Sequence, residues 1–297
     1  MIRGSIVALV TPFCGQSCKV DWEALKNLVD WHISEGTNAI VAVGTTGESS
    51  TLNVAEHQKI IQFVVSASDG RIPIIAGTGA NSTNEALELT ASAKDAGADA
   101  CLLVTPYYNK PTQEGLHQHF KIIAESIDIK QILYNVPSRT ACNIDVDTVL
   151  RLASLSRVVG IKEASGDLER AANIIANRPR DFAIYSGDDP TARKLMLLGG
   201  DGNISVTANI VPNSMALMCD FALARDEDRA YEIDSSMREL HDALFVESNP
   251  IPVKWVLSKM GMIENTLRLP LTPLSDGFHE RVRLAMLRAK IKQKILT

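Results

Sequence analysis

Short runs of apolar residues recur along this chain, and longer amphipathic stretches separate them. Eight runs have the length and composition of strands that are buried on both faces. They are Ile6–Val10, Ala39–Val43, Ile72–Ala76, Ala100–Val104, Gln131–Tyr134, Val158–Lys162, Phe182–Ser186 and Asn203–Val206. Alternating strands and helices predict either a (β/α)8 TIM barrel or a doubly wound open sheet. The number of runs and their even spacing favour the barrel.

Two further features of the pattern support a repeated strand–helix unit. The first run leads into Thr11–Pro12–Phe13, whereas a nucleotide-binding open sheet would place a glycine-rich loop there. A similar joint also occurs three times, as E-G-T-N-A-I-V from 35, A-G-A-D-A-C-L from 96 and G-G-D-G-N-I-S from 199. Each joint predicts a helix that ends on a left-handed glycine and turns directly into a strand.

The pattern changes at about Ala224, where charged helical stretches begin. Two proline-rich joints, at 249–252 and 270–273, interrupt these stretches. We therefore expect residues 1–224 to form a catalytic barrel and residues 225–297 to form a C-terminal helical extension that packs on it. The helices expected in the extension are Asp226–Glu247, Pro252–Met260 and Asp276–Ile295.

The composition of the 297 residues, with 45% hydrophobic and 22% charged residues, is that of an ordinary globular protein. A net charge of −5 argues against a nucleic-acid partner. Five cysteines, an odd number, do not suggest a disulfide framework, and no Cys/His cluster has the spacing of a metal site. The chain shows neither a membrane span nor a signal-peptide pattern, so we expect a cytoplasmic protein.

Lys162 closes the apolar run Val158–Ile161 and is the most informative residue of the chain. A lysine at the end of a buried strand is most often simply solvated. In a desolvated site, however, the ammonium form is disfavoured. The neutral amine can then attack a ketone and form a Schiff base. The residues at the ends of the other strands decide between these interpretations.

In a barrel, the C-terminal ends of all strands converge on one mouth. Taken singly, each polar residue there could be a turn, core or surface residue. Together they supply an amine, hydroxyls, phenols and a guanidinium, which suit a small keto acid. The segments are G-T-T-G-E at 44–48, T-P-Y-Y-N at 105–109, Y-N-V-P-S-R-T at 134–140, S-G-D-D at 186–189, and Ile204–Ser205.

Three of these segments carry a family resemblance. G-T-T-G-E, Y-N-V-P-S-R-T and the lysine of G-I-K-E-A-S-G-D resemble the pyruvate-dependent class I aldolase superfamily, and more narrowly its dihydrodipicolinate synthases. The resemblance covers essentially the whole chain, including N-P-I-P-V-K-W at 249–255 and L-R-L-P-L-T-P-L at 267–274. It implies a lyase that condenses pyruvate with L-aspartate-4-semialdehyde in the diaminopimelate pathway to lysine.

The resemblance also implies roles for individual residues. Lys162 would form the Schiff base with pyruvate, and Tyr134 would shuttle protons over it, linked to Thr45 and Tyr108. Tyr108 would reach the site of a neighbouring subunit. Thr46 and backbone groups at Gly187 and Ile204 would orient substrate and lysine, and Arg139 would bind the carboxylate of the aldehyde. The chemistry implies no metal or organic cofactor, and the family usually forms a homotetramer, a dimer of tight dimers.

Members of this family that are inhibited by L-lysine bind it at the tight-dimer interface. One matching residue, Val54, departs from the pattern, because sensitive members often carry histidine there. We therefore expect inhibition by lysine to be retained but weaker. The other matching residues are Ser49, Ser50, His57, Asn81, Glu85 and Tyr107.

Two kinds of alternative remain open at this point. The protein could act on another 2-keto acid, as an N-acetylneuraminate lyase or a 2-keto-3-deoxygluconate aldolase does, although Arg139 and Thr45 argue against this. It could also be a non-catalytic barrel that senses a keto acid, although a sensor has no need of the nucleophile Lys162.

Overall fold

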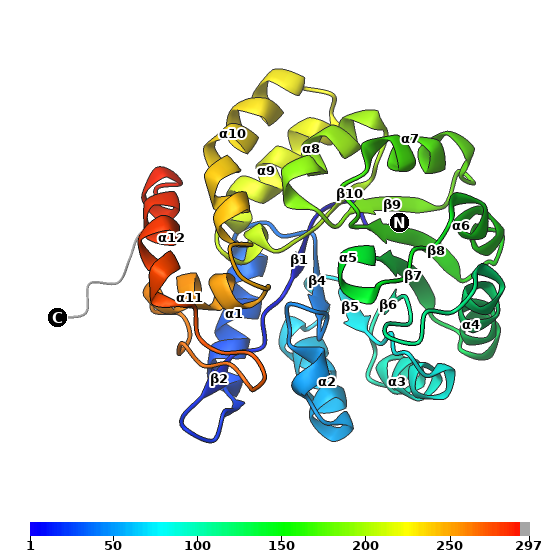
Figure 1. Cartoon of the computed structure of the whole chain (residues 1–297), viewed down its shortest axis with the longest axis horizontal. Helices are drawn as coiled ribbons and strands as arrows, with labels where there is room; N and C mark the ends of the chain where they lie inside the picture. Colours follow the sequence, from blue (N-terminus) through cyan, green and yellow to red (C-terminus); the bar gives the residue numbers. More distant parts are fainter. Residues whose placement is uncertain (292–297) are drawn as a thin grey trace.

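Eight parallel strands close into a barrel in the computed structural model, which describes residues 1–291 (Figure 1). The strands follow each other around the barrel in the order β1-β10-β9-β8-β7-β6-β5-β4. Their bounds are β1 Gly4–Ala8, β4 Ala39–Ala42, β5 Ile74–Gly77, β6 Ala100–Val104, β7 Lys130–Asn135, β8 Val158–Glu163, β9 Ala183–Ser186 and β10 Gly202–Ser205. The predicted TIM barrel is therefore confirmed, and every expected run forms a strand.

Helices alternate with these strands and surround the barrel (Figure 1). They are α1 Trp22–Ser34, α2 Val54–Ser68, α3 Thr83–Asp95, α4 Gln113–Ser126, α6 Val146–Ala153, α7 Leu168–Asn177, α8 Asp189–Leu198 and α9 Pro212–Leu223. Shorter elements follow several strands, namely the helix α5 Pro137–Thr140 and the 3-10 turns η1 Ser49–Thr51 and η2 Thr207–Asn209. The pattern did not predict a small antiparallel hairpin formed by β2 Phe13–Cys14 and β3 Lys19–Val20.

The three repeated joints have the predicted backbone conformation. Gly36, Gly97 and Gly199 have φ angles of +87°, +88° and +121°. Because L side chains rarely adopt such angles, glycine is the residue that lets each helix end and turn at once into the next strand.

Apolar side chains fill two concentric layers. Alternate strand residues point into the barrel, where Val41, Leu102 and Ile132 belong to one buried cluster. The other residues of each strand point outward and pack beneath the surrounding helices. The barrel interior is thus a packed core rather than a pore, and polar chemistry is confined to its ends.

The C-terminal extension packs on the last two barrel helices, α8 and α9 (Figure 1). It consists of α10 Glu227–Ala243, α11 Ile251–Lys259 and α12 Asp276–Arg288. Its apolar residues belong to the same buried cluster as residues beneath the barrel helices, so the extension shares the barrel's core. The division at residue 224 remains a prediction. The last helix is shorter than the expected Asp276–Ile295, because it ends at Arg288 and Lys290 has a left-handed φ angle of +56°. Ile295 itself lies outside the described residues.

The first helix of the extension is shorter than predicted. It was expected to reach Glu247, but α10 ends at Ala243. The amides of Phe245 and Val246 donate to the carbonyls three residues earlier, which tightens the end of the helix. Asn249 precedes a proline and disfavours helical backbone. The freed segment 245–249 instead turns toward the mouth of the barrel.

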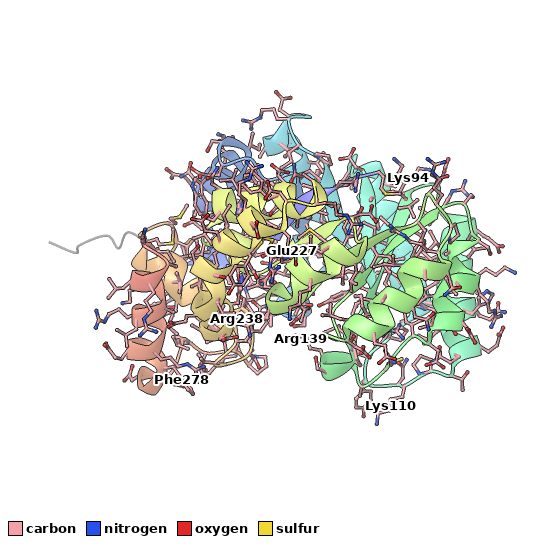
Figure 2. The ribbon with its side chains drawn as sticks, turned by 90° about the horizontal axis from the view of Figure 1, so that it is seen from above. Lys94, Lys110, Arg139, Glu227, Arg238 and Phe278 are labelled. Carbon is pink, nitrogen blue, oxygen red and sulfur yellow. The ribbon has the colours of Figure 1, made fainter. Side chains whose placement is uncertain are left out.

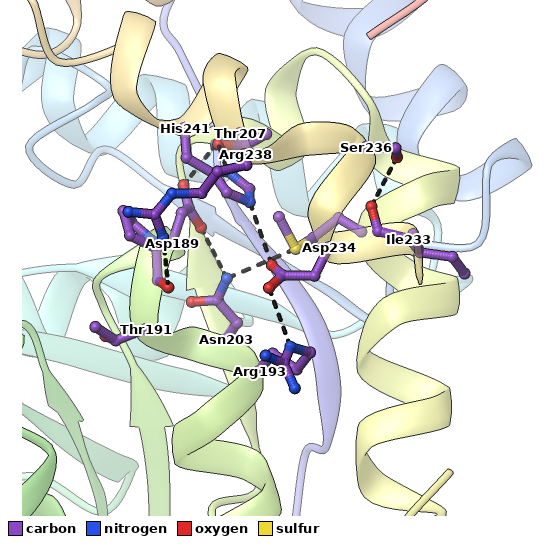
Figure 3. Close-up of polar contacts among 12 residues, drawn as sticks. Asp189, Thr191, Arg193, Asn203, Thr207, Ile233, Asp234, Ser236, Arg238 and His241 are labelled. Atoms are coloured by element: carbon purple, nitrogen blue, oxygen red, sulfur yellow. Dashed lines mark hydrogen bonds and ion pairs between the residues drawn. The ribbon is translucent and has the colours of Figure 1, made fainter. Parts of the chain in front are cut away.

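A buried polar network joins the extension to the barrel (Figure 3). Asp234 of α10 accepts from Arg193 Nε of α8 at 3.1 Å, and its Oδ1 lies 3.6 Å from His241 Nε2. The Nδ1 atom of His241 lies 2.8 Å from Thr207 Oγ1, directly after β10. The two hydrogen bonds, Arg193 to Asp234 and His241 to Thr207, fix α10 relative to the strand ends, because buried hydrogen bonds are costly to break.

None of the described helices is both long enough and apolar enough to cross a membrane.

Candidate active site

A cavity of about 510 Å³ lies at the C-terminal ends of the barrel strands. Most of the residues singled out in the sequence line it, on different strand ends. These are Thr45 and Thr46 after β4, Tyr134 on β7, Arg139 after β7, Lys162 on β8 and Gly187 after β9. The barrel thus brings to one place residues that are up to 142 positions apart in the chain (187 − 45).

Lys162 and Tyr134 lie side by side in the barrel wall. They are paired in register between β7 and β8, so both side chains point into the barrel. Lys162 Nζ lies 4.4 Å from the centre of the Tyr134 ring. Both side chains are buried, with 5% and 7% of their surfaces exposed. The amine is therefore held against a phenol in a largely desolvated position.

Gly187 leaves the space that Lys162 occupies. A Cβ at position 187 would lie 2.7 Å from Lys162 Cε and 2.6 Å from the Cβ of Ala164. Such distances are far shorter than ordinary van der Waals contact, so any larger residue would displace the lysine. The glycine at the end of β9 thus fits the lysine at the end of β8.

Glu163, the residue after Lys162, anchors β8 from its outer side. Its carboxylate accepts from Arg170 Nε at 2.8 Å and from Asn135 Nδ2 at 3.1 Å. The backbone N–H of Ser165 donates to the same carboxylate at 2.9 Å. The polar groups of Glu163 are therefore satisfied within the wall, and the strand end that carries Lys162 is fixed.

The segment G-T-T-G-E leaves β4 through a strained residue. Val43 has a φ angle of +57°, which is an outlier for a β-branched residue. A Cβ on Gly77 of the next strand would lie 2.3 Å from the Val43 carbonyl oxygen, so glycine is needed there for the chain to turn. Strain of this kind typically costs about 1–3 kcal/mol and persists only where the surroundings enforce it. Here it directs Thr45 and Thr46 into the mouth.

Arg139 and Thr46 are tied to the extension through Asn249. Arg139 Nη2 donates to the Asn249 carbonyl at 3.2 Å, and Asn249 Nδ2 donates to Thr46 Oγ1 at 3.0 Å. In Figure 2, Arg139 lies between the extension, which carries Arg238 and Phe278, and the green half of the barrel. The guanidinium is an exposed cation at the rim of the cavity, where it can meet an incoming anion.

A buried ion pair fixes the end of the G-T-T-G-E segment. Lys254 Nζ of α11 lies 2.5 Å from Glu48 Oε1, and neither side chain is exposed. Burial lowers the pKa of the Lys254 ammonium, and the carboxylate of Glu48 opposes that shift. The N–H of Arg268 donates to Glu48 Oε2 at 3.2 Å. The Lys254 ammonium and the Arg268 guanidinium also lie over the Phe13 ring, at 4.2 Å and 4.3 Å from its centre.

A second cavity of about 300 Å³ adjoins the first and shares Thr45 and Arg139 with it. Most of the residues matched to a lysine site line this second cavity, namely Ser49, Ser50, Val54, His57, Glu85 and Tyr107. Asn81 does not line it but donates from Nδ2 to the Tyr107 carbonyl at 3.2 Å. Burial lowers the pKa of His57, so its imidazole is neutral at pH 7.

Two of the residues expected to take part in catalysis or substrate binding do not line the cavities of this single chain. Ile204 is buried inside the barrel, in the apolar cluster beneath the mouth. Tyr108 has 90% of its surface exposed and a φ angle of +75°, so its ring projects into solvent. Within the cavities, buried Ile204 can offer only its backbone groups, and exposed Tyr108 can reach a site only in another chain.

Within residues 1–291, no three His, Cys, Asp or Glu side chains are grouped so as to hold a metal ion.

Comparison with known proteins agrees with this geometry. The sequence profile of the dihydrodipicolinate synthetase family matches residues 1–289. The chain belongs to this family. Among curated relatives, the 4-hydroxy-tetrahydrodipicolinate synthases of Stutzerimonas stutzeri and Pseudomonas aeruginosa are each 60% identical over 286 residues, covering 96% of this chain and 98% of theirs.

Solved structures of the family superpose on nearly the whole chain. The chloride-inhibited dihydrodipicolinate synthase of Acinetobacter baumannii, in complex with pyruvate, has a TM-score of 0.97 and 56% identity, covering 98% of this chain and all of that one. The enzyme of Cyanidioschyzon merolae with lysine bound has a TM-score of 0.95 and 38% identity, covering 98% of this chain and 99% of that one.

These relatives settle the class of the protein. As a member of the dihydrodipicolinate synthetase family, the chain is a pyruvate-dependent enzyme that forms a carbon–carbon bond in diaminopimelate and lysine biosynthesis. The sialic-acid and ketodeoxygluconate aldolases and the non-catalytic sensor are not favoured, because the close relatives are named as 4-hydroxy-tetrahydrodipicolinate synthases.

The sequence analysis did not identify all of the residues that line the mouth of the barrel. Phe245, Ser248 and Asn249 of the extension line the larger cavity. Asp188 lines it too; the sequence placed its segment S-G-D-D at the mouth but assigned the residue no role. The proline after Asn249 was a signal that α10 could not run straight into α11. No signal in the sequence indicated that the segment 245–249 folds back over the barrel, because that contact joins residues about 200 positions apart.

We predict that Lys254→Met destabilises the protein by about 3–5 kcal/mol, because it leaves the carboxylate of Glu48 buried without its partner. The double variant Glu48→Gln/Lys254→Met removes both charges, so its free energy of unfolding should fall substantially less. Urea unfolding at one fixed protein concentration measures both values. Lys259→Met, on the exposed side of the same helix, is the control and should change stability by no more than about 0.5 kcal/mol. Equal losses in the single and double variants would show that the pair is not coupled.

Proposed function

We propose that this protein condenses pyruvate with L-aspartate-4-semialdehyde through a Schiff base on Lys162. The observation that carries the proposal is the buried amine of Lys162 against Tyr134, in a cavity with Arg139 at its rim. A lysine amine that borders a cavity can add to the ketone carbon of a bound keto acid and form a Schiff base. A carboxylate-bearing substrate fits a rim that carries a guanidinium.

The reaction proceeds in steps that the geometry supports. Lys162 Nζ adds to the ketone carbon of pyruvate, and loss of water gives a protonated imine. This cation draws electrons from the neighbouring methyl group, which loses a proton to form an enamine. The enamine carbon then bonds to the aldehyde carbon of the second substrate. Finally the amine of the product attacks the imine carbon and displaces Lys162 as the ring closes.

The residues around Lys162 supply proton transfer and orientation. Tyr134 exchanges protons with the ketone oxygen and the methyl group, assisted by the hydroxyl of Thr45. Both residues also line a smaller cavity of about 40 Å³ in the barrel wall, which agrees with their working together. Thr46 and backbone groups at Gly187 and Ile204 orient the carboxylate of pyruvate and the lysine. Arg139 binds the carboxylate of the aldehyde.

No metal or organic cofactor enters this scheme, since the protonated imine on Lys162 is itself the electron sink. The protein supplies only burial, orientation and proton transfer.

Incubation with pyruvate and borohydride should place a reduced pyruvate adduct on the peptide that contains Lys162, because borohydride traps the imine. Intact and peptide mass spectrometry detects the adduct. Lys162→Ala should give none. Tyr134→Phe should still form the adduct but lose turnover by about 100- to 10,000-fold, since it lacks the proton shuttle. An adduct on another lysine would discard the mechanism, and nearly full turnover of Tyr134→Phe would discard the role of Tyr134.

Tyr108 completes the site of a neighbouring subunit in this proposal. Its exposed ring and left-handed backbone support a residue that is directed away from its own barrel. A tight dimer would cover the ring and bring it to the partner's Tyr134. Two tight dimers would then form the homotetramer that is usual for this family.

Subunit complementation tests this arrangement. Tyr108→Phe and Lys162→Ala should each be nearly inactive alone, and co-refolded mixtures should recover activity. In a mixed dimer one site receives both a native Lys162 and a native Tyr108, so recovery approaches one quarter of the wild-type activity for random pairing of two equal populations. Mixing Tyr134→Phe with Lys162→Ala is the control, because Tyr134 and Lys162 of one chain belong to the same site. No mixed dimer then contains an intact site, and activity should stay at the level of the separate variants. Equal recovery in both mixtures would contradict a Tyr108 that crosses between subunits.

The second cavity binds L-lysine as an inhibitor in this proposal. Its support is the grouping of Ser49, Ser50, His57 and Tyr107 around one space, with the carboxylate of Glu85 available to an ammonium group. The cavity shares Thr45 and Arg139 with the catalytic cavity, so a ligand there can act on substrate binding. Val54, with half of its surface exposed in this cavity, cannot make the polar contact that histidine would make, so weakened affinity is expected.

Isothermal titration should detect lysine binding at or below millimolar concentrations. Glu85→Gln should weaken it by about 10- to 100-fold, because a charged hydrogen bond is lost. Glu88→Gln, on the same helix but outside the cavity, should leave it unchanged. Absence of binding at millimolar lysine to the wild-type protein would end the idea.

A further inference from the structure

Two basic side chains and one acidic side chain line the larger cavity. Lys162 and Arg139 are basic, and Asp188 carries the only carboxylate among the described residues that line the cavity. The steps assigned above use both basic side chains: the amine of Lys162 for the ketone and the guanidinium of Arg139 for a carboxylate. They leave the carboxylate of Asp188 without a partner in the chemistry.

The barrel order places Asp188 and Arg139 on opposite sides of Lys162. Arg139 follows β7, Lys162 lies on β8 and Asp188 follows β9, and these three strands are neighbours. Because adjacent strands are about 4.8 Å apart, the strands that carry the two outer charges are separated by about 10 Å. The nucleophile therefore stands between an anion and a cation.

The two aspartates of S-G-D-D have different environments. Asp189 is buried, and its carboxylate accepts from Asn203 Nδ2 and from the N–H groups of Val206 and Thr207 at 2.8–3.0 Å (Figure 3). It is fully used in holding the turn after β10. Asp188 is only partly buried and borders the cavity.

The carboxylate of Asp188 is held in place but retains a free acceptor. Its Oδ2 accepts from Thr191 Oγ1 at 2.6 Å, and its backbone N–H donates to Ser186 Oγ at 3.2 Å. Among the described residues none donates to its Oδ1. An oriented carboxylate with one oxygen available is the arrangement that binds an ammonium group strongly.

We propose that Asp188 binds the α-ammonium group of the aldehyde substrate and thereby selects an amino acid over a simple oxo acid. This inference rests on the proposed function, since it names the group that recognises the second substrate. L-Aspartate-4-semialdehyde carries an ammonium and a carboxylate on one carbon. The carboxylate meets Arg139 and the ammonium meets Asp188, while the aldehyde faces the enamine on Lys162.

The order of the strand ends suits this placement, because Arg139 and Asp188 follow the two strands on either side of the one that carries Lys162, and all three residues line one cavity. Three fixed contacts on one chiral carbon and its chain also distinguish the L form from the D form.

A purely structural role for Asp188 makes a different prediction. Asp188 precedes α8, where a carboxylate can interact with the helix N-terminus. It makes no side-chain bond to the N–H groups of that helix. Asp145 stands at the same position before α6, also without such a bond, and lines neither cavity. Asp145→Asn is therefore a matched control for the loss of one charge at a helix start.

The test compares the natural aldehyde with succinate semialdehyde, which has the aldehyde and the carboxylate but no ammonium group. In Asp188→Asn, the KM for L-aspartate-4-semialdehyde should rise by about 10- to 100-fold, because a charged hydrogen bond is lost. The inhibition constant of succinate semialdehyde should stay within about twofold of the wild-type value. The rate of borohydride trapping with pyruvate should be unchanged, and Asp188→Glu should recover part of the affinity for the aldehyde.

Four outcomes would overturn the proposal. If both constants rise together, or if Asp145→Asn has the same effect, Asp188 acts on the fold and not on the ammonium. If neither constant changes, Asp188 does not contact the substrate. If the wild-type protein forms no pyruvate adduct on Lys162, the proposed function itself fails, and the inference fails with it. If the wild-type protein condenses the two substrates and Asp188→Asn does not behave as predicted, only the role of Asp188 fails and the proposed function stands.

Discussion

The buried contact between Glu48 and Lys254 is the constraint on which the rest of the mouth depends. It connects the end of the G-T-T-G-E segment to α11, across about 200 residues of sequence, with neither side chain exposed. A buried charge pair contributes little net stability, because desolvation offsets most of the attraction. What it does supply is a defined position, since either charge alone would be very unfavourable. Thr45 and Thr46 lie three and two residues before Glu48, so the pair limits the positions they can take at the mouth.

The same device recurs at the other strand ends that carry the site. Glu163 follows Lys162 and is bound by Arg170 and Asn135, and Asp189 follows Asp188 and is bound by Asn203 and two backbone N–H groups. In each case a buried carboxylate next to a site residue is satisfied by fixed donors. The strand ends are thereby rigid, and the side chains that meet the substrate need little reorganisation.

The extension completes the site as well as covering the barrel. It supplies Lys254 to the buried pair, and Asn249 links the hydroxyl of Thr46 to the guanidinium of Arg139. The early end of α10 makes this possible, because the segment 245–249 lies outside the helix and lines the cavity at Phe245, Ser248 and Asn249. The barrel and the extension share one apolar core, so the position of α11 is fixed by the same packing that stabilises the fold.

The sequence by itself determined the barrel and the strand ends that carry the polar residues of the mouth, and it singled out Lys162 as the candidate nucleophile. Alternation of apolar runs with amphipathic helices is a local signal, and the repeated glycine joints are local as well. The register that puts Tyr134 beside Lys162, the fit of Gly187 to that lysine and the return of Asn249 to Thr46 were decided only by the tertiary structure. Each of these contacts depends on which distant segments meet when the barrel closes and the extension packs, and no periodicity along the chain records that choice. The difference between Asp188 and Asp189 is of the same kind, because two identical neighbours acquire different environments only from what the fold places around them.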